Sequence, residues 1–151
     1  MAVDAGTETL SFRAATEADA TEILALWEQA AENDARAADD RGAVMALLRR
    51  DPDALDLAVL DGRIVGSLIS GWDGWRAHLY RLAVHPDARR RGIGRRLLAR
   101  AHDRLSALGA TRLDAMVLEG NALGQSLWAA EGYRPQEEWR RWVLPVEAGR
   151  P

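Results

Sequence analysis

The residues best suited to chemistry in this chain form one basic, glycine-containing segment, Arg89-Arg90-Arg91-Gly92-Ile93-Gly94. An apolar run ending at Val84 precedes the segment and a stretch of helical periodicity follows it, which predicts a strand, a loop and a helix start. The first N–H groups of a helix lack backbone partners and carry about half a positive charge, so they attract phosphate. Because glycine has no Cβ, an anion can approach these groups closely. The segment therefore predicts a phosphate-binding loop.

Two better-known phosphate-binding patterns do not fit this segment. The P-loop pattern requires a Lys-Ser/Thr pair, which is missing, and the dinucleotide-binding pattern requires a third glycine where Leu97 stands. A short glycine motif beside arginine also fits an ordinary turn with a solvated basic face, or a contact with nucleic acid. The net charge of -3 argues against a general nucleic-acid binder. The phosphate interpretation therefore depends on the strand before the segment and the helix after it.

Composition excludes several other kinds of site. The chain has no cysteine, which excludes disulfides, thiolate metal sites and a thiol nucleophile. Its histidines, His78, His85 and His102, are scattered, so we expect no metal site. No run approaches the roughly 18 to 20 apolar residues of a membrane-spanning helix, and Met1 to Thr9 lacks the features of a targeting signal. We therefore expect a cytoplasmic protein with no membrane partner.

The elements that must hold the segment fit one domain, since the chain has 151 residues of which 48% are hydrophobic. We predict a flexible N-terminus over residues 1–9, a domain over 10–145 and a tail over 146–151. Asp61-Gly62 tolerates the positive φ angles of a type I′ hairpin turn. Periodicity predicts an α/β fold with a mixed, mostly antiparallel central sheet flanked by helices. The predicted strands cover residues 10–13, 57–60, 64–70, 77–84, 113–118 and 139–144, and the predicted helices begin after Thr16, around Val44, at Gly92 and at Leu123.

Two motifs carry a resemblance to a known family. The basic segment follows Val84-His85-Pro86, and Asn121 begins a predicted helix that ends before Gly132-Tyr133. In both respects the chain resembles the GNAT superfamily of acetyl-CoA-dependent N-acetyltransferases, whose signature is Gln/Arg-x-x-Gly-x-Gly/Ala after a strand ending Val-x-Pro. The order of elements is also similar, and the resemblance covers roughly residues 10–144. It implies a GNAT-like acyltransferase fold.

The resemblance also implies acetyl-CoA (coenzyme A) as the cofactor and assigns residues to it. The backbone amides of residues 91–96 would bind the pyrophosphate, and the main chain of residues 82–84 would pair with the pantetheine arm. Asn121 would contact the pantetheine or the thioester, and either Arg89 or Arg90 would meet the 3′-phosphate. The residues assigned to the cofactor are Leu82, Ala83, Val84, Arg89, Arg90, Arg91, Gly92, Ile93, Gly94, Arg95, Arg96, Asn121 and Trp128.

Transfer to nitrogen requires a neutral amine, and because a lysine-like amine has a pKa of about 10.4, a base must remove a proton. In some relatives a glutamate on the strand before the loop does this; His78 stands at that place, and an unperturbed histidine has a pKa of about 6.5. Tyr80 on the same strand face and Glu119 at the mouth of the next strand are the other candidates. Trp128 replaces the tyrosine that donates a proton to the leaving thiolate in many relatives, and an indole cannot supply that proton. Without cysteine, we expect direct attack in a ternary complex, with the oxyanion held by the N–H of Leu82.

The acceptor is expected opposite the cofactor, against the first two helices and residues 71–75. Acidic side chains there suit a cationic amine, and tryptophans suit a planar one, although both also fit an ordinary surface or core. These residues are Glu28, Glu32, Asp34, Asp39 and Asp40, and Trp72, Trp75, Trp139 and Trp142.

Three functions follow from these patterns. We predict an N-acetyltransferase that acts on a primary amine of a small molecule or peptide. The alternatives are a non-catalytic coenzyme A-binding sensor or interaction protein of the same fold and, more distantly, a basic-loop nucleic-acid module. We expect no nucleic-acid partner, and Trp139 and Trp142 on a last strand would permit a homodimer.

Overall fold

The computed structural model of the chain describes residues 6–30 and 39–146. Its centre is one five-stranded sheet in the order β1-β2-β3-β4-β5. The first four strands pair antiparallel, and β5 pairs with β4 in parallel. The predicted mixed, mostly antiparallel sheet is therefore confirmed. The strands are β1 (Leu10–Ala14), β2 (Leu55–Leu60), β3 (Arg63–Trp72), β4 (Ala77–Val84) and β5 (Leu113–Ala115).

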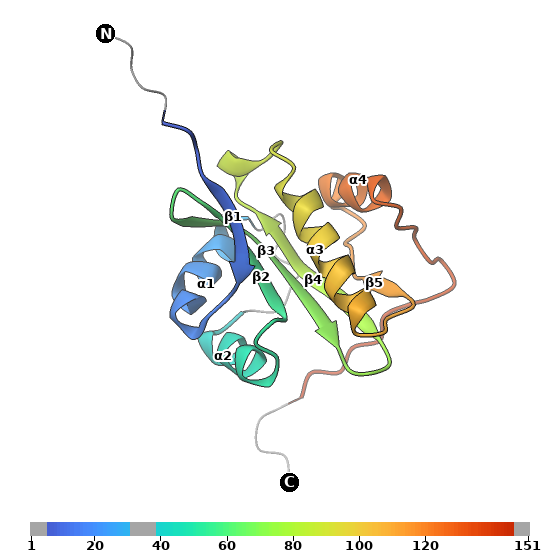
Figure 1. The fold of residues 1–151 in the computed structure, drawn as a ribbon. Helices are drawn as coiled ribbons and strands as arrows, with labels where there is room; N and C mark the ends of the chain where they lie inside the picture. Colours follow the sequence, from blue (N-terminus) through green and yellow to red (C-terminus); the bar gives the residue numbers. More distant parts are fainter. Residues whose placement is uncertain (1–5, 31–38, 147–151) are drawn as a thin grey trace.

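Helices cover both faces of the sheet, with α1 (Ala20–Gln29) and α2 (Arg41–Arg50) on one side and α3 (Ile93–Ala107) on the other, next to α4 (Ala122–Ala130) (Figure 1). Each layer buries its own apolar core, because each helix carries one apolar stripe. Within the described ranges, no helix is long and apolar enough to cross a membrane. Fully buried side chains include Ile23, Leu26 and Leu57 on the α1 side and Leu79, Leu97 and Leu105 on the α3 side.

The β2–β3 hairpin forms as the sequence predicts. Asp61 and Gly62 have φ angles of 48° and 80°, the two positive values that a type I′ turn requires. The Asp61 carboxylate also accepts a hydrogen bond from the Thr9 N–H at 2.9 Å, which closes the turn against the chain before β1. The hairpin thereby places β3 at the centre of the sheet, between β2 and β4.

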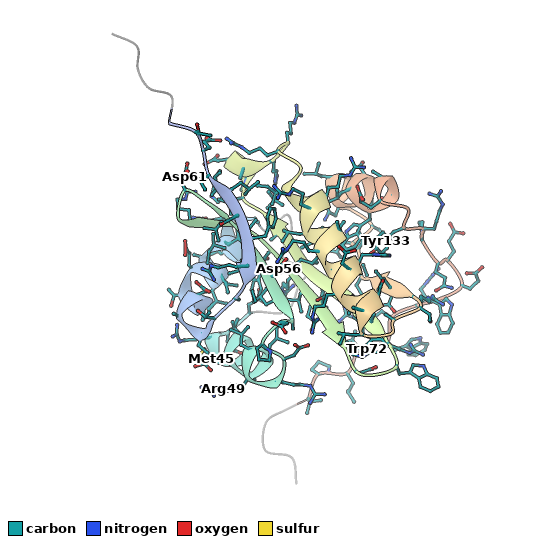
Figure 2. All side chains as sticks on the ribbon, viewed as in Figure 1. Met45, Arg49, Asp56, Asp61, Trp72 and Tyr133 are labelled. Atoms are coloured by element: carbon teal, nitrogen blue, oxygen red, sulfur yellow. The ribbon has the colours of Figure 1, made fainter. Side chains whose placement is uncertain are left out.

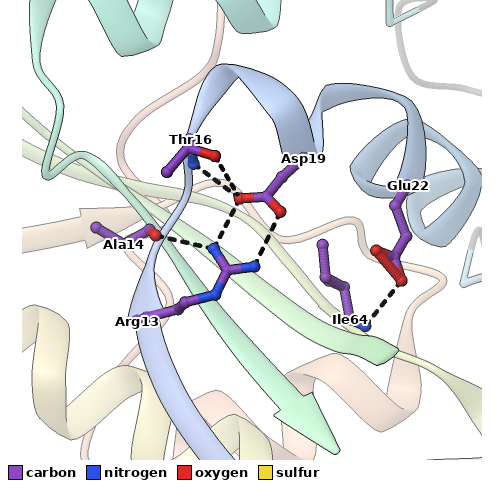
Figure 3. Close-up of polar contacts among 6 residues, drawn as sticks. All are labelled: Arg13, Ala14, Thr16, Asp19, Glu22 and Ile64. Atoms are coloured by element: carbon purple, nitrogen blue, oxygen red, sulfur yellow. Dashed lines mark hydrogen bonds and ion pairs between the residues drawn. The ribbon is translucent and has the colours of Figure 1, made fainter. Parts of the chain in front are cut away.

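The start of α1 is fixed to the sheet by the carboxylate of Asp19 (Figure 3). Asp19 accepts hydrogen bonds from the Thr16 N–H at 2.8 Å and from both terminal nitrogens of Arg13 at 2.7 and 2.9 Å. This contact with the Arg13 guanidinium is the main reason that the pKa of Asp19 falls to about 2. The helix predicted after Thr16 begins as a 3-10 turn, Glu17–Asp19, and continues as α1.

Two arginines of α3, Arg100 and Arg104, tie this helix to the sheet and its neighbouring segments. Arg100 of α3 donates to both carboxylate oxygens of Asp56 on β2, at 2.5 and 3.0 Å, and Asp56 is labelled in Figure 2. Arg104, one turn further along, donates to the Ser70 carbonyl oxygen at 2.5 Å and pairs with Asp51 at 2.5 Å. These contacts hold α3 over β2 and β3, and so set where its N-terminus lies.

Two predicted strands differ from the structure. β5 ends at Ala115 instead of residue 118, and the Leu118 side chain after it is 45% exposed, so it has no sheet face to cover. The strand predicted over residues 139–144 is wrong, because this segment pairs with no strand in the described chain. Its tryptophans, Trp139 and Trp142, stand three residues apart, which breaks strand alternation, and both are exposed. The basis for a homodimer through a last strand is therefore lost.

Candidate active site

The edge of β4 that faces β5 is only partly paired. The parallel ladder joins residues 77–79 of β4 to residues 113–115 of β5, and there it stops. β4 continues to Val84 and stays paired with β3 on its other edge. Among the described residues, no strand pairs with the β5-facing edge of β4 beyond Leu79. The main chain of residues 82–84, predicted to pair with the pantetheine arm, lies in this unpaired stretch, and a strand edge of this kind presents N–H and C=O groups.

A bulge at Arg81 interrupts β4 within this stretch. Arg81 has a φ of 55°, in the left-handed region, and the register with β3 shifts at this point. The Ser67 hydroxyl donates to the Arg81 carbonyl oxygen at 2.9 Å and accepts from the Trp27 indole N–H at 2.8 Å. The Arg81 guanidinium lies over the Trp27 ring and donates to Asp39 at 3.0 and 2.5 Å. The bulge is therefore held from the α1 side of the sheet.

These contacts also correct the predicted acidic surface. Asp39 is neutralised by Arg81, and the Asp40 carboxylate caps α2 by accepting the Ala43 N–H at 2.8 Å. Glu32 and Asp34 lie outside the described residues. Of the predicted acidic set, the two aspartates nearest α2 thus have structural partners; the partner of Asp39 could not be read from local sequence, because Arg81 lies far along the chain.

The N-terminus of α3 is open. Gly92 is its N-cap residue, has a φ of 73° and has no atom within 4 Å of the position that a Cβ would take. No side chain of the described residues caps this end, and the first helical hydrogen bond runs from the Arg96 N–H to the Gly92 oxygen at 3.0 Å. The amides of residues 93–95 therefore have no helical acceptor, which makes them the donors of this end. The Arg96 amide, predicted to be one of the phosphate donors, already donates this hydrogen bond to the Gly92 oxygen.

Gly94 also contributes to the packing of α3 against α4. It is buried, and a Cβ at this position would lie 2.9 Å from the Cδ2 of Leu127 on α4. The missing side chain therefore lets α4 pack closely against the first turn of α3. Of the two glycines, Gly92 is the one with open space beside it.

Most of the predicted arginine cluster is engaged within the protein. Of the five arginines in this cluster, Arg90 is the one whose exposed side chain makes no ion pair, hydrogen bond or ring contact with the described residues, and its backbone φ of 64° is left-handed. Arg90 is therefore the member of the cluster best placed to meet a ligand phosphate. The other contacts are Arg89 Nε to the Val84 carbonyl oxygen (3.3 Å), Arg91 to Glu8, Arg95 to Glu131 (3.0 Å), and the Arg96 guanidinium over the Phe12 ring (4.3 Å to the centroid).

His78 and Tyr80 share the β4 face opposite α3, since Ala77 and Leu79, which alternate with them, are buried in the α3-side core. The Nδ1 of His78 lies 2.5 Å from the Oδ1 of Asp114, and both side chains are half-exposed. Burial raises the pKa of Tyr80, so its phenol is protonated at neutral pH. Of the two predicted bases on β4, His78 is therefore the one whose neutral side chain has a nitrogen lone pair that can accept a proton.

The third candidate base, Glu119, and the predicted cofactor residues Asn121 and Trp128 lie beyond β5. Glu119 is exposed in the turn before α4, past the point where β5 ends, so it does not stand at the mouth of a strand. The Asn121 side chain caps α4 by accepting the Gly124 N–H at 2.8 Å. Trp128 is 8% exposed in the α3-side core and meets the Tyr133 ring edge to face at 4.9 Å (Tyr133 is labelled in Figure 2). The indole at the usual acid position thus packs as a core residue.

Comparison with known proteins agrees with this architecture. The model of the Acetyltransferase (GNAT) family matches residues 14–133. An acetyltransferase of Yersinia enterocolitica is 33% identical over 132 residues, which cover 85% of this chain and 90% of that protein. An acetyltransferase of Pectobacterium atrosepticum is 45% identical over 74 residues, which cover 49% of this chain and 52% of that protein. The structure of PaiA N-acetyltransferase from Thermoplasma acidophilum in complex with coenzyme A has a TM-score of 0.76 at 15% identity, over 85% of this chain and 91% of that one, and shows the shared fold alone.

Proposed function

The chain belongs to the GNAT family of acetyltransferases, and from that premise we propose that it transfers the acetyl group of acetyl-CoA directly to a primary amine of a small molecule or peptide. One observation carries the proposal. The uncapped end of α3, with Gly92 open beside it, lies next in sequence to the strand whose edge is unpaired beyond Leu79. The N-terminus of a helix can bind phosphate, and the edge of a strand can pair with amides. Coenzyme A contains both a pyrophosphate and the amides of its pantetheine arm.

The residues present fit acetyl-CoA. The amides of residues 93–95 would donate to the pyrophosphate, because they have no helical acceptor and a Cβ is missing at Gly92. The main chain of residues 82–84 would hold the two amides of the pantetheine arm. We assign the 3′-phosphate to Arg90 in preference to Arg89, since the Nε of Arg89 already donates to the Val84 carbonyl oxygen.

Catalysis would depend on three groups of β4. Bound acetyl-CoA supplies a thioester, whose carbonyl carbon bonds to the amine nitrogen while the C–S bond breaks and the thiolate leaves. The Nε2 of His78 would accept the proton that the acceptor must lose before it can attack. The N–H of Leu82 would donate to the carbonyl oxygen as negative charge develops there. Tyr80, protonated because burial raises its pKa, would orient the acceptor by a hydrogen bond.

A cationic acceptor is favoured by the charges around His78. Asp114 contacts the imidazole, and the carboxylate of Asp73 in the β3–β4 turn interacts with it electrostatically. Asp39 is instead paired with Arg81, and Asp40 caps α2. The negative potential would draw an ammonium group toward the place where it is deprotonated.

The proposal is tested by thiol release. Purified protein is mixed with acetyl-CoA and a panel of polyamines, amino acids, aminoglycosides and peptide N-termini, and free thiol is followed with a colorimetric reagent. Because the chain has no cysteine, the signal comes from coenzyme A alone. We expect release that depends on one class of amine. If coenzyme A binds but no amine releases thiol, transfer is ruled out and the non-catalytic coenzyme A-binding alternative is supported.

A further inference from the structure

The closest polar contact of the candidate base is with a residue that the sequence motifs do not include. His78 and Asp114 come from strands 36 positions apart and lie side by side in the parallel register of β4 and β5. The Nδ1–Oδ1 distance is 2.5 Å. The side chains are 43% and 44% exposed, so the pair is neither a core ion pair nor a fully solvated one.

The pair stands in the middle of the short β4–β5 ladder, one position before its last pair, Leu79 and Ala115. The residues on either side of it, Ala77 and Leu79 on β4 with Leu113 and Ala115 on β5, belong to the α3-side core, so the pair lies on the opposite face. Across the sheet, His78 is opposite Gly71 of β3, which contributes no side chain. The imidazole therefore contacts Asp114 of β5 on one side. On the other side, Gly71 of β3 has no side chain that could cover the imidazole.

The other two histidines make weaker contacts with aspartate, which makes the His78 pair distinctive. The Nδ1 of His85 accepts the backbone N–H of Asp87 at 3.1 Å and lies 3.8 Å from its carboxylate. The Nδ1 of His102 lies 3.9 Å from Asp103 on the exposed face of α3. Among the residues that the structure describes, only His78 has a carboxylate oxygen at hydrogen-bond distance from Nδ1.

The chemistry of the contact fixes the tautomer. An ionised carboxylate can only accept, so the Nδ1 of His78 must carry the hydrogen, and in the neutral ring the Nε2 lone pair is then free. The carboxylate of Asp73 makes no hydrogen bond with His78 within the described residues; its Oδ1 accepts the backbone N–H groups of Trp75 and Arg76 at 2.7 and 2.6 Å. Asp114 is thus the group that determines which nitrogen can accept a proton.

We propose that Asp114 is a positioning residue for acetyl transfer, which holds the His78 ring and keeps Nε2 unprotonated and available to the acceptor amine. This inference rests on the proposed function, because it requires His78 to be the base. Loss of Asp114 should leave coenzyme A binding intact and should lower only the rate of proton removal.

The first test reads the tautomer directly, without turnover. The full chain with ¹⁵N-labelled histidine is examined by ¹H–¹⁵N correlation at the alkaline end of a pH titration, and His78→Gln assigns the signal. We expect the Nδ1–H form for His78. Asp114→Asn, whose amide can donate to Nδ1, should convert it to the Nε2–H form, whereas the matched control Asp103→Asn should leave all three histidines as in wild type. A wild-type His78 with its proton on Nε2 would overturn the proposal.

The second test separates positioning from a structural role. Asp114→Asn should reduce kcat/KM for the amine at least tenfold, but by no more than His78→Gln does, since general-base catalysis contributes about 10²- to 10⁴-fold. Its pH–rate profile should also change shape. In a His78→Gln background the same substitution should cause no further loss. If Asp114→Asn reduces kcat/KM by the same factor in the wild-type and the His78→Gln backgrounds, the positioning role is overturned. Asp114→Ala, measured in the same way, is a second variant for this comparison.

Failure of the proposed function would look different. If no amine releases thiol from wild type, acetyl transfer itself is excluded. If His78→Gln turns over like wild type, His78 is not the base, and the positioning role falls with it. If His78→Gln is impaired while Asp114→Asn matches wild type, the base stands and the inference about Asp114 alone is overturned. Coenzyme A affinity, measured by calorimetry for each variant, verifies that the fold is intact.

Discussion

Replacement of Asp19 by asparagine should destabilise the protein at neutral pH and have little effect in strong acid. The pKa of Asp19 falls from an ordinary value of 3.8 to about 2, and such a fall corresponds to about 2.4 kcal/mol of preference for the ionised form in the folded state. The partner that contributes most, Arg13, has a side chain that is 45% exposed, so solvent screening reduces this contribution. We therefore predict that Asp19→Asn lowers the free energy of unfolding by about 1 to 2 kcal/mol.

The sign of the pH dependence follows from the direction of the shift. Because the pKa is lower in the folded protein than in the unfolded chain, the stabilisation is complete above the unfolded value and is lost as the pH falls from about 4 to about 2. Urea unfolding of wild type and Asp19→Asn across this range should show a difference that shrinks toward zero. Asp103→Asn, at an 87% exposed position on α3, is the control and should differ little at any pH. A difference that stays constant through the acid range would refute the reasoning.

Three other predictions concern positions around the cofactor site. In Gly66→Ala the new Cβ would lie 2.9 Å from the Cγ2 of Ile93, and overpacking of this kind should lower Tm by about 3 to 10 °C. The control is Gly120→Ala, whose new Cβ has no atom within 4 Å. Equal Tm values for the two variants would contradict the packing described. Arg90→Ala should weaken coenzyme A binding about tenfold but leave 3′-dephospho-coenzyme A binding unchanged, as measured by calorimetry. The same loss with both ligands would remove Arg90 from the 3′-phosphate. Asn121→Ala should lower the free energy of unfolding by about 1 kcal/mol through the lost helix cap, while Asn121→Asp keeps the cap oxygen and should preserve Tm. If Asn121→Asp binds coenzyme A with unchanged affinity, the side-chain amide does not bind the cofactor.

Features encoded within a few residues could be predicted from the sequence. Asp61-Gly62 determines its turn because both residues tolerate positive φ, and the structure has both. The helix predicted to begin at Gly92 starts one residue later in the structure, and its buried apolar side chains face one core. The loop before α3 belongs to the same class, because an open helix end depends on Gly92 and its neighbours only.

Features that depend on contacts between distant residues could not be predicted. The burial of Gly94 depends on Leu127, and the neutralisation of Asp39 depends on Arg81, each brought close only by the fold. The partner of His78 requires the register of β4 and β5, which no local pattern contains. The strand predicted over residues 139–144 failed for the same reason, because strand formation requires a neighbouring strand and not only apolar residues.

The binding site itself is tested most directly by titration calorimetry of coenzyme A into wild type, Gly92→Glu and Gly109→Glu. Both glycines have left-handed backbone, with φ of 73° and 105°, and they lie just outside opposite ends of α3, so the two substitutions place similar strain and the same charge on the same helix. We predict that Gly92→Glu abolishes binding, because a carboxylate would take the space of the pyrophosphate, while Gly109→Glu binds as wild type does. Equal affinity of wild type and Gly92→Glu would contradict the assignment of the cofactor to the N-terminus of α3.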